Sequence, residues 1–84
     1  MLYHRVMQLL LVEDDLEIQT FLRHALAEAG YKVDAAPNAK SAERLAMENR
    51  HDVLIVDLGL PDQDGMGLIL RLRQMGVRSE GAHV

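Results

Sequence analysis

The sequence has no cysteine and no tryptophan, only two prolines, and a single phenylalanine among its 84 residues. Without cysteine, the chain can form neither a disulfide framework nor a thiolate metal site. Long apolar runs are also missing, because the longest are far shorter than the roughly 20 residues that a membrane-spanning helix needs. The N-terminus lacks the apolar core and cleavage pattern of a signal peptide. These absences favour a soluble, cytoplasmic protein that makes no membrane contact.

Positive charge is scarce, with 9 Lys and Arg residues against 13 Asp and Glu residues. Basic side chains form no stripe, and Arg71, Arg73 and Arg78 are too few to indicate a nucleic-acid surface. We therefore predict no nucleic-acid contact by this segment. The length predicts one small domain over residues 1–84, which would bury roughly 60–65% of its surface.

Two short apolar segments each end on acidic side chains. Residues 9–12 precede Glu13 and Asp14, and residues 53–56 precede Asp57. Such runs are typical of buried parallel strands, whose carboxyl ends meet at the edge of the sheet where open α/β folds bind ligands. Carboxylates gathered there repel and raise each other's pKa unless a cation joins them. The pattern therefore predicts a Mg²⁺ site.

The remaining sequence alternates between the two-residue hydrophobic period of a strand and the 3.6-residue period of a helix. It predicts strands at residues 6–12, 31–35 and 53–57, and helices at residues 16–29, 39–49 and 66–75. Asp14 or Asp15, Asn38 and Asp64 are the expected N-caps, and Gly30 and Gly76 the expected helix ends. This order predicts an α/β fold with a parallel sheet and right-handed crossovers.

The same patterns predict which side chains are buried. Residues 31–35 alternate as an edge strand with one solvent-facing side does, whereas residues 53–57 are apolar on both faces, as a central strand is. The expected core positions of the first helix are Ile18, Phe21, Leu22, Ala25, Leu26 and Ala29, and those of the third are Met66, Leu68, Ile69, Leu72 and Met75. The four histidines, His4, His24, His51 and His83, share no metal-binding spacing and are expected on the surface.

Residues 11–15 and 52–65 together resemble the receiver domain of two-component response regulators. The matching motifs are the acidic pair Glu13-Asp14 and the run D-L-G-L-P-D-Q-D-G that begins at Asp57. The resemblance extends from the first predicted strand through the third helix. It implies a flavodoxin-like fold with strand order 2-1-3-4-5, here incomplete, with three of five βα units. The family's strand-four hydroxyl residue and strand-five lysine have no counterpart in this sequence.

The resemblance also implies a function. Asp57 would accept a phosphoryl group from a sensor histidine kinase in a Mg²⁺-dependent reaction. Asp14 would bind Mg²⁺ directly, Glu13 through water, and Gly59 through its backbone carbonyl, with Asp57 itself as a further ligand. Such a domain is a signalling module and not an enzyme, and it commonly regulates transcription through an attached output domain. No output domain is recognisable in this sequence.

Plainer interpretations of the acidic residues stay open. Asp57 could simply cap the following turn, and Asp14 and Asp15 could be helix N-caps that interact favourably with the helix dipole. For Asp15 a cap is the preferred interpretation. A calcium loop around Asp62 and Asp64 is excluded, because Arg71 stands where the bidentate glutamate belongs.

Two other functions compete with the receiver hypothesis. A magnesium phosphohydrolase with an Asp57 nucleophile would need a second aspartate two residues further on, where the sequence has Gly59. Alternatively, the chain is a truncated receiver that cannot be phosphorylated and only oligomerises, through the unpaired edge of the strand at residues 53–57.

Overall fold

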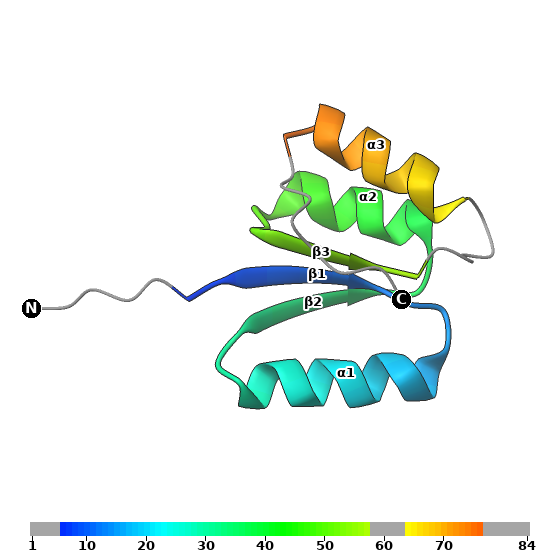
Figure 1. The fold of residues 1–84 in the computed structure, drawn as a ribbon. Coiled ribbons are helices and arrows are strands. Elements are labelled where there is room, and N and C mark those ends of the chain that lie inside the picture. The colour runs from blue at the N-terminus through cyan, green and yellow to red at the C-terminus, as the bar shows by residue number, and fades with distance from the viewer. Residues whose placement is uncertain (1–5, 58–63, 77–84) are drawn as a thin grey trace, which may run out of the picture.

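The computed structural model describes residues 6–57 and 64–76. These residues form a three-stranded parallel sheet flanked by three helices (Figure 1). The elements follow the order β1 (Gln8–Val12), α1 (Leu16–Glu28), β2 (Lys32–Ala36), α2 (Ala39–Glu48), β3 (Val53–Val56) and α3 (Gly65–Gln74). The strand order is β2-β1-β3. The predicted α/β class with a flavodoxin-like arrangement of the first three strands is therefore confirmed.

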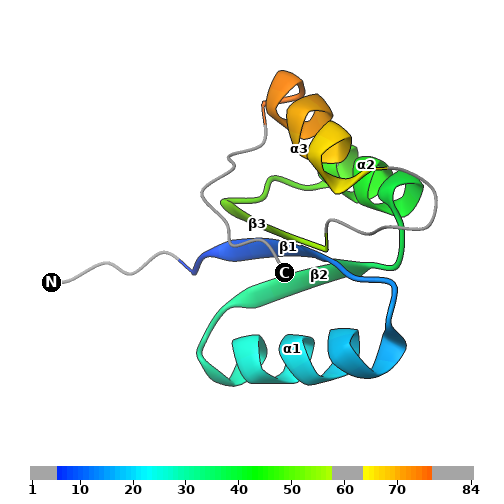
Figure 2. The same cartoon turned by 45° about the vertical axis from the view of Figure 1, so that its right-hand side comes forward.

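The helices cover the two faces of the sheet unequally. Helix α1 lies on one face, and α2 and α3 lie together on the other (Figures 1 and 2). Because successive side chains of a strand point to opposite faces, Leu10 and Val12 of β1 enter the core beneath α2 and α3. The other members of this core are Ala36, Ala39, Ala42, Leu54, Val56, Leu68, Ile69 and Leu72.

Strand β1 is the central strand of the described sheet, and all its residues after Gln8 are buried. Strand β3, which the sequence made apolar on both faces, pairs with β1 alone among the described residues. Its Val53 and Ile55 are half-buried. The prediction that residues 31–35 form an edge strand is confirmed, since β2 pairs only with β1 in the described part of the chain.

The helix caps follow the sequence signals. Asp15, Asn38 and Asp64 are the N-caps of α1, α2 and α3, and each side chain accepts a hydrogen bond from the first turn of its helix. Gly30 follows the end of α1 at a φ of 99°, a conformation that glycine adopts without strain. Its N–H donates to the carbonyl of Ala27 at 3.0 Å, and the N–H of Tyr31 donates to that of Leu26 at 3.1 Å, which is a Schellman motif.

The expected apolar stripe of α1 is largely exposed, so that prediction was wrong. Phe21 is 70% exposed, and Ile18 is exposed as well. Helix α1 packs against β2 and β1, and only Leu22 and Leu26 of the stripe are even half-buried. The remaining stripe residues, Ile18, Phe21, Ala25 and Ala29, are exposed. In α3, Leu68, Ile69 and Leu72 are buried as expected, whereas Met66 and Met75 lie outside the buried face and are exposed.

A second correction concerns His51, which is buried and not on the surface. Its Nε2 lies 2.7 Å from Oδ2 of Asp34, which also accepts hydrogen bonds from Gln8 Nε2 and Asn49 Nδ2, each at 3.2 Å. Asp34 is consequently not a solvent-facing residue of an alternating strand. It stands in register with Leu10, on the face that α2 covers. His24 is exposed, as predicted, while His4 and His83 lie outside the described residues.

None of the helices in the described ranges, 6–57 and 64–76, is long and apolar enough to cross a membrane.

Candidate metal and phosphoacceptor site

The sheet register places two acidic residues side by side. Val12, the last residue of β1, pairs with Val56, the last residue of β3, so Glu13 and Asp57 leave neighbouring strands at the same level. The backbone pairing continues past both strand ends. The N–H of Asp57 donates to the carbonyl of Val12 at 2.9 Å, and the N–H of Glu13 donates to the carbonyl of Ala36 in β2 at 3.0 Å. The backbone of both acids is thereby fixed.

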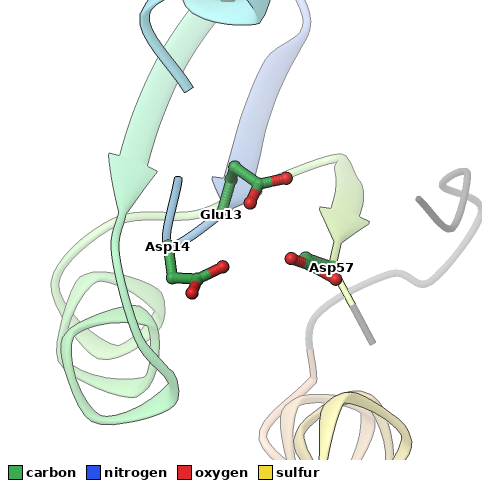
Figure 3. A group of neighbouring side chains, drawn as sticks. All are labelled: Glu13, Asp14 and Asp57. Carbon is green, nitrogen blue, oxygen red and sulfur yellow. The ribbon is translucent and has the colours of Figure 1, made fainter. Parts of the chain in front are cut away.

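Glu13, Asp14 and Asp57 form the acidic cluster. Each offers a carboxylate oxygen, and these oxygens all lie within 4.8 Å of one another. Glu13 is buried, Asp57 is half-buried and Asp14 is exposed. The carboxylates of Asp14 and Asp57 point toward each other across the space between the ends of β1 and β3 (Figure 3). A small cation there would be reachable from solvent and from three carboxylates at once.

The electrostatics of the cluster favour such a cation. Burial raises the pKa of Glu13 above its ordinary value, and the neighbouring Asp57 and Asp14 carboxylates raise it further. The backbone N–H of Asp15, which donates to Glu13 Oε2 at 3.1 Å, lowers the pKa but does not cancel the rise. A divalent cation would relieve this repulsion, and carboxylate oxygens are the ligands that Mg²⁺ prefers. The residues present therefore fit a hard divalent ion.

Asp15 serves a different purpose from its two acidic neighbours. Its Oδ1 accepts hydrogen bonds from the N–H groups of Glu17 at 3.0 Å and Ile18 at 3.1 Å. It is the N-cap of α1, as the sequence indicated. Gly59, the fourth expected metal ligand, lies outside the described residues.

Sequence reasoning missed one residue of this region. Gln19, the fourth residue of α1, donates from Nε2 to the backbone carbonyl of Glu13 at 3.0 Å. It is the only buried side chain of α1. The available signal was a polar residue between Ile18 and Leu22, inside an otherwise apolar stripe.

The sequence matches the response regulator receiver domain family over residues 9–80, and the chain belongs to that family. It is 43% identical over 72 residues to the virulence transcriptional regulatory protein PhoP of Salmonella typhimurium, an alignment that covers 86% of this chain and 32% of PhoP. It is 44% identical over 71 residues to the transcriptional regulatory protein PhoP of Escherichia coli O157:H7, covering 84% of this chain and again 32% of the relative. The chain thus spans about a third of the length of these curated relatives.

Solved structures give the same assignment. The chemotaxis response regulator CheY4 of Vibrio cholerae superposes with a TM-score of 0.82 at 29% identity, covering 86% of this chain and 60% of CheY4. A CheY-like receiver domain from Methylobacillus flagellatus reaches 0.87 at 25% identity, covering 94% and 69% of the two chains. The response regulator TrrA of Thermotoga maritima, solved with Mg²⁺-BeF, reaches 0.82 at 25% identity, covering 90% and 66%.

Proposed function

We propose that residues 1–84 are a partial receiver domain in which Asp57 accepts a phosphoryl group from a sensor histidine kinase in a Mg²⁺-dependent reaction. The observation that carries the proposal is the meeting of the Glu13, Asp14 and Asp57 carboxylates at the ends of two separate strands. Asp14 and Asp57 would bind the ion directly and Glu13 through water. The carbonyl of Gly59 is a further proposed ligand, on the strength of the family resemblance alone.

Each proposed role follows from the chemistry of phosphoryl transfer. The half-buried Asp57 is the nucleophile: a carboxylate oxygen attacks phosphorus, the bond from phosphorus to the donor's leaving atom breaks, and an acyl phosphate forms. The reaction asks the protein mainly for positioning and charge neutralisation, which bound Mg²⁺ would supply. The backbone hydrogen bond from Asp57 to Val12 holds the nucleophile beside the other two acids.

Signalling is the biological role that this chemistry supports. Receiver domains are signalling modules, and we propose that any hydrolysis of the acyl phosphate here is slow self-dephosphorylation. The names of the PhoP relatives describe transcriptional regulators. We therefore propose that a longer protein containing this domain regulates transcription through an output domain, without nucleic-acid contact by residues 1–84. A cytoplasmic location belongs to the same proposal.

A second function is favoured by the open side of the sheet. Strand β3 has one neighbour among the described residues, Val53 and Ile55 are half-buried, and Phe21 on α1 is exposed. An unpaired apolar edge pairs readily with another strand. We propose that two copies of the chain associate through β3. Sedimentation over a range of concentrations should show a dimer that dissociates in Ile55→Lys; a monomer at every concentration would contradict this proposal.

Intact-mass spectrometry after incubation with acetyl phosphate tests the main proposal. The expected result is one phosphoryl adduct that requires Mg²⁺ and is absent from Asp57→Asn. Asp64→Asn is the matched control, because asparagine also caps a helix and Asp64 caps α3 outside the cluster. An adduct that persists in Asp57→Asn would show that the phosphoryl group is attached to a residue other than Asp57. A folded wild-type chain without any adduct would contradict the phosphoacceptor role and favour association through β3 as the function of this chain.

A further inference from the structure

We propose that Gln19 is a positioning residue for the cation site, acting through its buried hydrogen bond to the backbone carbonyl of Glu13. This inference rests on the proposed function, because it assigns a role toward the same metal site. The side-chain amide lies 3.0 Å from that carbonyl, and Gln19 is 7% exposed. Its place in α1 explains the direction of the contact, since helical side chains lean toward the helix N-terminus and so toward the β1–α1 turn.

The hydrogen bond completes the immobilisation of Glu13. Its N–H donates to the carbonyl of Ala36 at the end of β2, and its own carbonyl accepts from Gln19. The peptide unit that joins Glu13 to Asp14 is planar. Fixing its carbonyl therefore also fixes where the backbone of Asp14 begins. Asp14 is exposed, and its direction therefore depends on the backbone more than on packing around its side chain. Gln19 thus aims Asp14 as well as Glu13 at Asp57.

A neutral amide suits this position. It donates a hydrogen bond to a buried carbonyl that would otherwise lose its partner. It does so beside three carboxylates without adding a positive charge, and a charged donor at the same place would compete with the metal for those acids. The helix supports the amide in turn, because the N–H of Gln19 donates to the carbonyl of the N-cap Asp15 at 2.9 Å.

A purely structural role is the competing explanation, and metal affinity separates the two. If Gln19 only ties the start of α1 to β1, removing its donor lowers the melting temperature and leaves the Mg²⁺ affinity of the folded protein unchanged. If Gln19 positions the ligands, the folded variant binds Mg²⁺ more weakly. Loss of a hydrogen-bond partner behind a metal ligand commonly costs about 10- to 100-fold in affinity.

Isothermal titration of the full chain with Mg²⁺ provides the test. Gln19→Met keeps the length of the side chain and removes the donor, and we expect a Kd at least about tenfold above that of the wild type. Thr20→Val is the matched control, an isosteric change at the next, exposed position of the same helix, and it should leave the Kd unchanged. A folded Gln19→Met protein with the wild-type Kd would overturn the inference. A wild-type chain that binds no Mg²⁺ would instead overturn the proposed function.

A measurement on the wild type keeps the inference testable even where Gln19→Met does not fold. The side-chain amide resonances of Gln19, Gln8 and Gln74 are followed by NMR during a Mg²⁺ titration. Coupling between Gln19 and the site requires that its amide shifts in step with the backbone amides of Glu13 and Asp14, while the other two stay constant. A Gln19 amide that does not respond when those backbone amides shift would overturn the inference.

Discussion

The hydrogen bonds onto Asp34 connect three parts of the described fold, so this side chain is expected to matter for stability. Its Oδ2 accepts from His51 Nε2 at 2.7 Å and from Gln8 Nε2 and Asn49 Nδ2 at 3.2 Å each. These contacts tie β2 to the start of β1 and to the segment between α2 and β3. The Asp34 side chain is only 24% exposed, and that of His51 is fully buried. We predict that Asp34→Ala lowers stability substantially.

The magnitude follows from the geometry. A short hydrogen bond to a charged acceptor contributes roughly 1.5–3 kcal/mol, and the two longer ones contribute about 0.5 kcal/mol each. Partial exposure of Asp34 reduces the sum to roughly 2–3 kcal/mol. The loss also deprives buried His51 of its hydrogen bond, since its Nδ1 has no partner among residues 6–57 and 64–76. In a domain of this size such a change lowers the melting temperature by roughly 10–20 °C.

Thermal and urea unfolding followed by far-UV circular dichroism measures the effect, because the chain has no tryptophan to report by fluorescence. Glu28→Ala is the control, an exposed acid at the end of α1 that should cost no more than about 0.5 kcal/mol. Equal melting temperatures for Asp34→Ala and Glu28→Ala would refute the reasoning.

The pH dependence of the same pair gives a second check. Burial alone would raise the pKa of Asp34, but the hydrogen bonds from His51, Gln8 and Asn49 outweigh it and lower the pKa below the ordinary value of 3.8. The folded state therefore favours the ionised form, whose stabilisation is fully present above pH 3.8 and is lost as the pH falls through the lowered pKa. The contribution of the Asp34 carboxylate to the difference between wild type and Asp34→Ala should be constant well above pH 3.8 and shrink below it. A difference that is independent of pH would exclude an ionised Asp34 as the cause.

Three further predictions concern packing and the acidic cluster. Leu10→Ala removes a fully buried core side chain and should lower the free energy of unfolding by about 2–5 kcal/mol in urea. Phe21→Ala should lower it far less, because Phe21 is 70% exposed. Similar losses for the two variants would mean that α1 packs differently. Mg²⁺ should raise the melting temperature of the wild type by binding only the folded state, and should not do so in Asp57→Asn. Because the pKa of Glu13 is raised, its carboxyl is neutralised at a higher pH than an ordinary glutamate's. The Mg²⁺-induced gain in melting temperature should therefore decline as the pH is lowered through that raised pKa, and a constant gain would remove Glu13 from the site.

Much of the fold could be predicted because its signals are local. The N-caps Asp15, Asn38 and Asp64 and the glycine after α1 are defined by residues one to three positions apart. The meeting of the acids at one edge was also accessible. An apolar run that ends on a carboxylate marks a strand end, and parallel strands bring their ends together.

The missed features depend on distant residues. Asp34 and His51 are 17 positions apart and meet only because β2 and β3 flank the same central strand. A polar residue among apolar helix positions was the only hint of Gln19, and its spacing does not reveal that it donates to the Glu13 carbonyl six residues earlier. The exposure of Phe21 could not be predicted either, although its spacing on the helix was clear. Helical periodicity identifies a common face, but it does not say whether another element covers that face.

The most direct test of the cation site is NMR of the ¹⁵N-labelled chain during titration with substoichiometric Mn²⁺, which broadens nearby resonances. If the carboxylates of Glu13, Asp14 and Asp57 bind one ion, the backbone amides of these residues should broaden first and together, and Asp57→Asn should abolish the effect at both strand ends. Broadening confined to one strand end, or spread equally over exposed acids such as Glu28 and Glu48, would contradict a single site between β1 and β3.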